Sequence, residues 1–492
     1  MGIPVYFKTL IQEYETEILK KDKLSQCNTL FLDLNCAIHP CCSGETDESK
    51  MIQNIIQKIE ELITYTEVSD LVYIAIDGIP PKGKMKQQRM RRYKSILEEK
   101  PWDTNSISPG TYFMDKVNAS IKEWMTKQNK KIIFSDSNER GEGEHKILQY
   151  IKKNNIQNSV IYGLDADLIM LSIVSRKDNI YLLRERTEYN IENTDNEYIY
   201  LMIDGLKKLI LQDIDINAPN EIVLDDYIFM CFLLGNDFIN HIPTLHLRYG
   251  GYTVLLEIYK LLQKRYQGYF QLIDLSLTNC IHLTFLKEFL QELSLKENYL
   301  HNLIQNRREK QYKYTYNKYN ELFLDFKKNY PNQDETISLE DIYDYQRGCI
   351  LDQESCKEMI FNLPILYWPK EKKCSNPYQG IAKDNVCKDF LDSLIWTAHY
   401  YFNECINWRW CTRYEIAPSI KDLSLYVSSK GKLSIEKESN EYTFEEQLQF
   451  IFPKESHKLH RYKIQTKDYR LKILPFHSRY LWECHIIFES YT

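Results

Sequence analysis

Acidic residues follow short apolar segments several times in the first 240 residues, within the runs LFLDLN, YIAIDG, RGEGEH, YGLDAD and LLGNDF. The seven carboxylates with this placement are Asp33, Asp77, Glu142, Glu144, Asp165, Asp167 and Asp237. At one sheet edge they would repel each other strongly unless cations lay among them. Hard oxygen ligands without a His/Cys set favour Mg²⁺ or Mn²⁺ over zinc. Any one acid could instead cap a helix or face solvent, but the repeated placement predicts a metal site.

Two such ions, about 3.5–4 Å apart, can activate a water molecule and stabilise the leaving oxygen of a phosphodiester. The acids therefore predict two Mg²⁺ ions, for which Mn²⁺ can substitute, and hydrolysis of a nucleic-acid backbone.

A strongly basic segment follows Asp77 and reads KGKMKQQRMRRYK over residues 82–94, without any acid. On a helix, one face would carry Lys84, Gln88, Arg91 and Arg92. Arginine binds phosphate through two N–H groups and lysine adds a point charge, so this face predicts a pocket for a terminal phosphate. A solvated helix or a localisation signal is the alternative. If a metal site lies beside a pocket for the terminal phosphate, cleavage occurs at a fixed distance from the chain end. This arrangement predicts an exonuclease.

The elements that must position these residues alternate between apolar runs and amphipathic or charged stretches. Strands are predicted at residues 29–34, 71–76, 131–134, 159–164 and 179–183. Helices are predicted at residues 50–64, 84–99, 110–128 and 143–153. This rhythm predicts an α/β fold with a mostly parallel, twisted sheet flanked by helices, in which ligands collect beyond the carboxyl ends of the strands.

The pattern changes after residue 250 and predicts three parts. Residues 1–250 form the α/β domain with the metal site and the phosphate pocket. Residues 251–340 form a helical connecting segment. Residues 341–492 form a second region that is helical and then, over 422–490, has short strands around a small helix, packed against the first domain.

Composition limits the classes of function. The net charge is −6, so affinity for nucleic acid must come from a local patch. The 13 cysteines include no C-x-x-C pair, and the start of the chain lacks the apolar core of a signal peptide, which favours reduced thiols in an intracellular protein. The cytoplasm is the expected compartment for a compact chain without sorting information, and the nucleus stays open. Apolar runs are too short to span a bilayer, so no membrane partner is expected. A monomer is the default expectation.

The motifs resemble, in order, those of the Xrn-type 5′→3′ exoribonucleases. They are MGIPVYF, LDLNCAIHP, IDGIPPKGKMKQQRMRRYKS, SISPGTYFM, IIFSDSNERGEGEHKI, YGLDADLIML and CFLLGNDFINHIP. A second region of the family is similar to FLDSLIWTAHYYFNECINWRWCTRYEIAPSIKDL, FEEQLQFIFP and WECHIIFE. The resemblance implies a 5′-nuclease or PIN-like core and a Mg²⁺-dependent, processive enzyme of RNA decay. Such an enzyme degrades single-stranded RNA with a 5′-monophosphate and releases nucleoside 5′-monophosphates.

The resemblance also implies roles for individual residues. By motif position the seven acids match the family's metal ligands, and Lys84, Gln88, Arg91 and Arg92 match its 5′-phosphate pocket. His39 matches a histidine that stacks on a 5′ base opposite a tryptophan, which here is Trp408 or Trp410; the run N-W-R-W leaves both open.

The sequence departs from the family pattern at Cys36, where Gly is usual, and at Arg140, where Pro is usual. Two other functions stay open. One is a flap-type 5′ nuclease acting on DNA, against which the basic helix and the second region speak. The other is a non-catalytic RNA-binding scaffold, against which the full set of acids speaks.

Overall fold

The computed structural model describes residues 14–97, 100–186, 196–304, 306–307, 310, 350–351, 381–414, 416–465, 469–474 and 485–490. The MGIPVYF motif, most of residues 311–380 and the WEC of the last motif lie outside this part of the chain. Among the described residues, no helix combines the length and the apolar character needed to cross a membrane.

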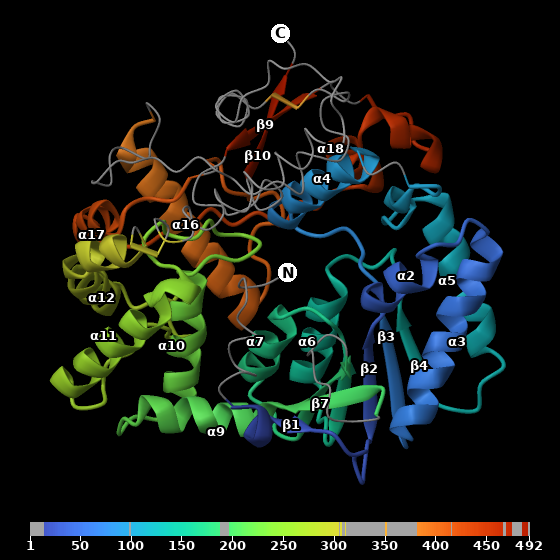
Figure 1. The fold of residues 1–492 in the computed structure, drawn as a ribbon, viewed down its shortest axis with the longest axis horizontal. Coiled ribbons are helices and arrows are strands. Elements are labelled where there is room, and N and C mark those ends of the chain that lie inside the picture. Colours follow the sequence, from blue (N-terminus) through green and yellow to red (C-terminus); the bar gives the residue numbers. More distant parts are fainter. Residues whose placement is uncertain are drawn as a thin grey trace, which may run out of the picture.

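A seven-stranded sheet lies at the centre of the N-terminal part, in the order β1-β7-β6-β5-β2-β3-β4 (Figure 1). Its strands are β1 (Leu19–Lys20), β2 (Thr29–Asp33), β3 (Leu71–Ala75), β4 (Ile132–Ser135), β5 (Ser159–Tyr162), β6 (Ile180–Glu185) and β7 (Tyr198–Met202). The pairings among β4, β3, β2, β5 and β6 are parallel, whereas β7 pairs antiparallel with β6 and β1. The predicted fold class is confirmed, with β1 and β7 as an antiparallel edge that was not predicted.

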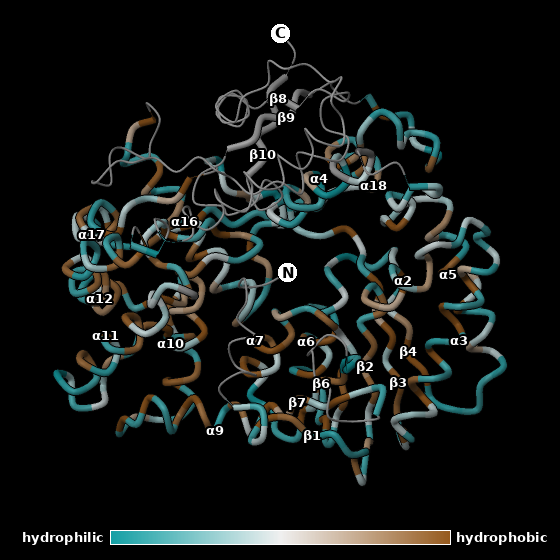
Figure 2. The backbone as a smooth tube through the Cα atoms, viewed as in Figure 1, coloured by the Kyte–Doolittle hydropathy of each residue, from teal (hydrophilic) through white to brown (hydrophobic). Residues whose placement is uncertain are grey.

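Both faces of the sheet are covered, because successive residues of a strand point to opposite sides. Leu30 and Leu32 join a core with helices α3 (Glu48–Thr66) and α5 (Tyr112–Met125), whereas Phe31 faces a second core with α6 (Gly143–Lys153) and α7 (Asp167–Val174). Hydrophobic residues accordingly gather along the strands in Figure 2. The helices of this part are α2 (Asn35–Cys42), α3 (Glu48–Thr66), α4 (Lys82–Leu97), α5 (Tyr112–Met125), α6 (Gly143–Lys153), α7 (Asp167–Val174), α9 (Ile203–Ile214) and α10 (Asn220–Phe232), with a short 3₁₀ helix at Thr104–Ser106.

The rest of the described chain is mainly helical and packs against the first part. Its helices are α11 (Gly251–Arg265), α12 (Leu283–Leu295), α16 (Lys383–Phe402), α17 (Ile420–Ser428) and α18 (Phe444–Ile451), with 3₁₀ helices at Leu247–Tyr249 and Lys454–Leu459. A small antiparallel sheet joins β8 (Ile350–Leu351), β9 (Tyr469–Leu474) and β10 (His485–Ser490). Met85 of α4 shares a buried cluster with Leu448 and Ile451 of α18, so the basic helix is held by the second region (Figure 1).

The prediction of short strands over residues 422–490 is wrong for most of that range. Helices α17 and α18 and the 3₁₀ helix at Lys454–Leu459 occupy its first part, and among the described residues of this range only β9 and β10 are strands. Side-chain caps explain the difference. The Ser419 hydroxyl accepts a hydrogen bond from the Asp422 amide, and Thr443 forms a capping box with Glu446. Such caps satisfy the free amides of a first helical turn and favour helix over strand.

Candidate active site

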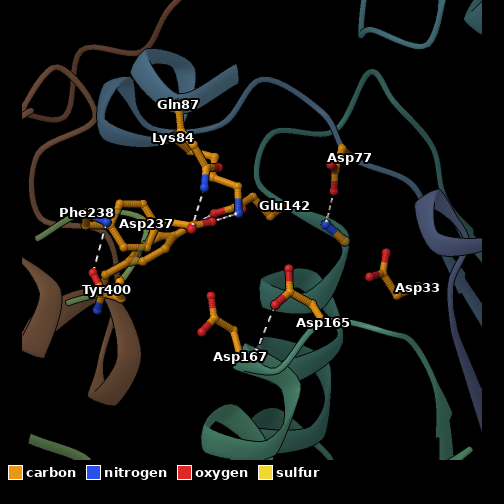
Figure 3. Close-up of polar contacts among 12 residues, drawn as sticks. Asp33, Asp77, Lys84, Gln87, Glu142, Asp165, Asp167, Asp237, Phe238 and Tyr400 are labelled. Atoms are coloured by element: carbon orange, nitrogen blue, oxygen red, sulfur yellow. Dashed lines mark hydrogen bonds and ion pairs between the residues drawn. The ribbon is translucent and has the colours of Figure 1, made fainter. Parts of the chain in front are cut away.

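Four of the predicted acids lie where parallel strands of the sheet end (Figure 3). Asp33 is the last residue of β2, and Asp77 lies two residues beyond β3. Asp165 lies in the turn after β5, and Asp167 is the first residue of α7. Because β5, β2 and β3 are neighbours and parallel, their carboxyl ends deliver these side chains to one place.

The other three acids come from helix ends that face the same edge. Glu142 is the N-cap residue of α6, and Glu144 lies in the first turn of that helix. Asp237 lies in the loop that follows α10, where the Asn236 side chain accepts hydrogen bonds from two backbone amides. Figure 3 shows Glu142 and Asp237 meeting at the Lys84 side chain, in the same close-up as the four strand-end acids.

A glycine between the two glutamates permits this approach. The amide of Gly143 donates a hydrogen bond of 2.7 Å to Asp77 Oδ1. A Cβ atom at Gly143 would lie 2.7 Å from Asp33 Oδ1, a contact that real side chains do not make. The G-E-G-E spacing therefore lets the start of α6 sit directly against the strand-end acids.

The acids alter one another's protonation, which shows that they are close. Burial and the charge of Asp77 raise the pKa of Asp33 to about 7. Burial and the charge of Asp165 raise the pKa of Asp167 to about 8 and that of Glu144 well above its usual range. A neighbouring like charge has this effect because it disfavours the ionised form.

The donor set fits a divalent cation. Asp33 Oδ1, Glu144 Oε2 and Asp167 Oδ1 are buried and have no hydrogen-bond partner within the described part of the chain. Leaving buried charged oxygens without a partner is costly unless a cation binds them. Since they are hard carboxylate oxygens, Mg²⁺ and Mn²⁺ suit them best.

Lys84 lies inside this acidic cluster. Its Nζ is 2.5 Å from Glu142 Oε2 and 2.8 Å from Asp237 Oδ2, and the residue is only 7% exposed. Burial alone would lower the pKa of Lys84, but Asp237 and Glu142 outweigh it and the pKa lies well above its usual range. Lys84 was predicted to belong to the phosphate pocket, and the structure shows it contacting the acids.

Three other residues of the predicted phosphate pocket have unused polar atoms. Gln88 Oε1, Arg91 Nε and Nη2, and Arg92 Nε are buried without hydrogen-bond partners among the described residues. Arg92 Nη2 donates to the Ile107 carbonyl at 3.1 Å. Burial and the charge of Arg91 lower the pKa of Arg92 to about 10. Two adjacent guanidiniums with free donors form a candidate anion site.

His39 lies beside these guanidiniums. The residue is exposed at the protein surface. Partial burial by nearby protein atoms and the charges of Arg92 and Arg91 lower the pKa of its imidazole to about 4. His39 is therefore neutral near pH 7.

The structure separates the two candidate tryptophans. Trp408 lies under the Arg140 guanidinium, 5.1 Å from ring centre to Cζ, and lines a cavity of about 390 Å³ with Arg140 and His145. Trp410 stacks on Trp396 at 5.0 Å. Each ring thus has one face covered, Trp410 by Trp396 and Trp408 by Arg140, and Trp408 also borders the cavity.

A row of stacked rings, here called the aromatic column, runs from Trp410 to the start of α6. Trp396 and Tyr400 stack at 4.8 Å, and Tyr400 and His145 at 3.8 Å. The Tyr400 hydroxyl also donates a 2.8 Å hydrogen bond to Glu142 Oε1. The second region therefore supports the acid cluster directly.

Several residues that touch the acids were not predicted from the sequence. Asn35 accepts a hydrogen bond from the Asp77 amide, Cys36 contacts Asp33, and Gln87 donates to Asp237. Asn35 and Cys36 adjoin Asp33 in the motif LDLNC, which was an available signal. Tyr400 contacts Glu142 across 258 residues of sequence, and nothing local indicates that pairing.

An α/β sheet that gathers buried carboxylates at the carboxyl ends of its strands defines a candidate divalent-metal protein. Two sequence profiles match this chain. The profile for the XRN 5′-3′ exonuclease N-terminus matches residues 1–100 and 96–186, and the profile for the Xrn1 helical domain matches residues 217–351 and 367–471. The chain belongs to the XRN 5′-3′ exonuclease family.

Curated relatives agree with this placement. The chain is 26% identical to 5′-3′ exoribonuclease 1 of Schizosaccharomyces pombe, over 86% of this chain and 42% of that protein. It is 26% identical to the 5′-3′ exoribonuclease 2 homolog of Drosophila melanogaster, over 92% of this chain and 64% of that protein. The chain thus spans less than two thirds of each relative. Among solved structures, the catalytic core of Rad2 in complex with DNA aligns with 55% of this chain and with 74% of its own length, at 14% identity. The TM-score of this alignment is 0.33.

Proposed function

We propose that this protein is a metal-dependent 5′→3′ exoribonuclease that degrades single-stranded RNA with a 5′-monophosphate, one nucleotide at a time, in RNA decay. The observation that carries the proposal is the position of Lys84. Its helix contacts the acid cluster at one end, and further along it carries Arg91 and Arg92, which keep guanidinium N–H groups without partners among the described residues. The names of the relatives, 5′-3′ exoribonucleases, support RNA as the substrate.

The acid cluster would hold two Mg²⁺ ions, which when bound activate water and stabilise the leaving oxygen of the cleaved bond. Gln88, Arg91 and Arg92 bind the 5′-phosphate and thereby set the first phosphodiester bond beside the acids. Cleavage leaves a new 5′-phosphate on the shortened RNA, which enters the same pocket. Processive degradation follows from this repetition.

Base stacking would hold the rest of the 5′ end. His39, next to the guanidiniums, stacks on one base and a tryptophan on another, at about 1–3 kcal/mol per base without dependence on sequence. The protein acts as a monomer in the cytoplasm under this proposal.

One comparison tests the function. The purified chain is incubated with 5′-phosphorylated single-stranded RNA, the same RNA with a 5′-hydroxyl, and a DNA flap, each with Mg²⁺ or with EDTA. We expect Mg²⁺-dependent release of nucleoside 5′-monophosphates from the first substrate alone. Preferential cleavage of the flap would make the protein a structure-specific DNA nuclease, and RNA binding without cleavage would make it a scaffold.

Arg91→Ala is expected to reduce the preference for 5′-monophosphate over 5′-hydroxyl RNA by roughly 10- to 100-fold, because a hydrogen bond to a charged group contributes about 1.5–3 kcal/mol. The ratio of kcat/KM for the two RNAs measures this. Arg89→Ala is the matched control, since the Arg89 guanidinium lies over the Phe450 ring at 5.1 Å. An unchanged ratio in the Arg91 variant would contradict the pocket.

Trp408→Ala and Trp410→Ala are expected to behave differently. Trp408 borders the cavity, so its loss should shorten the run of nucleotides removed per binding event, measured with an excess of unlabelled RNA as a trap. Trp410 packs on Trp396, so its loss should mainly lower the melting temperature. A Trp408 variant with full processivity and a Trp410 variant without it would reverse the assignment.

A further inference from the structure

Cys36 occupies a special place among the described cysteines, because its sulfur contacts the acid cluster. It is the second residue of α2, which begins directly after Asp33 and Leu34. The thiol donates a hydrogen bond to Asp33 Oδ2, with 3.2 Å between sulfur and oxygen. The Leu164 amide donates to the same sulfur at 3.3 Å. A thiol can be a weak donor and a weak acceptor at once, so the two contacts are compatible.

These contacts connect two strand ends that each carry an acid. Asp33 ends β2, whereas Leu164 directly precedes Asp165 in the turn after β5. The sulfur therefore bridges the Asp33 side chain and the backbone that presents Asp165. The pairing of β2 with β5 ends at Leu32 and Tyr162, so the ladder between these strands does not extend to Leu164 or Asp165.

The bridge also determines which oxygen of Asp33 is available. Oδ2 is engaged by the thiol, whereas Oδ1 is buried without a partner among the described residues, and Asp33 as a whole is 6% exposed. Oδ1 faces the start of α6, because a Cβ at Gly143 would lie 2.7 Å from it. Rotation of the carboxylate would turn this oxygen away from the other acids.

We propose that Cys36 is a positioning residue of the metal centre, which orients Asp33 and fixes the turn that carries Asp165, and thereby raises the affinity for the divalent cation. This rests on the proposed metal site. A carboxylate held in one orientation by an outer hydrogen bond binds metal more tightly than a free one, as outer partners of ligands do generally. The sulfur itself need not bind the cation.

The test measures Mn²⁺ binding to the full chain from the electron paramagnetic resonance signal of free Mn²⁺, without RNA. Cys36→Ala and Cys36→Val, which lack the donor and differ in volume, are expected to bind Mn²⁺ about three- to tenfold more weakly. Cys36→Ser keeps a donor and should stay within about twofold of the wild type. Cys41→Ala on the same helix, where the thiol lies near Lys58 and Glu61, should bind like the wild type.

Each outcome decides the question. Wild-type affinity in both Cys36→Ala and Cys36→Val overturns the proposal. An equal loss in Cys36→Ser and Cys36→Ala also overturns it, because packing rather than the hydrogen bond would then be responsible. If the wild type binds no Mn²⁺, or if Asp165→Ala/Asp167→Ala binds as well as the wild type, the proposed metal site itself fails. In RNA hydrolysis, the Mg²⁺ concentration for half-maximal rate should rise in parallel with the loss of Mn²⁺ affinity.

Discussion

The double variant Asp165→Ala/Asp167→Ala is expected to hydrolyse RNA at least about a thousandfold more slowly than the wild type, because the metal ions supply several kcal/mol of stabilisation to the developing charge. RNA binding should remain measurable, since Arg91, Arg92 and the stacking rings are untouched. Single-turnover hydrolysis and a filter-binding assay with 5′-phosphorylated RNA measure the two properties. Full hydrolysis in this variant would refute the metal site.

The same variant has a second expected signature in its stability. Without metal it should melt at or above the wild-type temperature, because burial and the repulsion from Asp165, which together raise the pKa of Asp167, no longer disfavour the folded state. Added Mg²⁺ should stabilise the wild type by mass action and leave the variant unchanged. Asp178→Ala, which removes an acid whose side chain is 82% exposed, is the control and should respond to Mg²⁺ like the wild type. Equal stabilisation of the double variant would place the cation elsewhere.

Trp396→Ala is expected to lower the free energy of unfolding by about 3–5 kcal/mol, the range for truncating a large buried aromatic side chain. Trp396 is 0% exposed, stacks on both Tyr400 and Trp410, and donates a 2.8 Å hydrogen bond to the Asn407 carbonyl. The midpoint of urea denaturation measures the loss.

Trp396→Phe is the matched control and should lose much less, because it keeps an aromatic ring in the cavity. RNA hydrolysis by Trp396→Ala should fall more than stability alone explains, since Tyr400 no longer has a fixed position against Glu142. A loss below about 1 kcal/mol in Trp396→Ala would show that the site collapses around the smaller residue.

Strands and helices with a clear local pattern of apolar residues were predicted from the sequence. Strands β2, β3 and β5 are buried on both faces and therefore read as continuous apolar runs, each ended by an acid. Helix α6 was predicted with its observed bounds, because an amphipathic pattern follows the G-E-G-E segment. Strand β7, which lies between β6 and the edge strand β1, was missed because it pairs antiparallel and so falls outside the β-α rhythm.

The contacts of Lys84 could not be predicted from the local sequence pattern. Helical spacing places Lys84 on one face with Arg91 and Arg92, and that face was assigned to a single phosphate. A helix rises about 1.5 Å per residue, so Lys84 and Arg92 lie roughly 12 Å apart along the axis. One end of the face therefore reaches Glu142 and Asp237, while the other carries the guanidinium N–H groups that lack partners among the described residues. The packing of α4 over the sheet edge determines which of its residues contact the acids, and this packing cannot be predicted from the sequence of α4 alone.

The aromatic column connects the first region of the chain with the second. Trp410, Trp396 and Tyr400 come from the second region, whereas His145 and Glu142 belong to the first. A fragment that ends before residue 381 would expose the back of α6 to water and release one oxygen of Glu142. The half of the chain that bears the carboxylates therefore depends on the other half for the position of one of its acids.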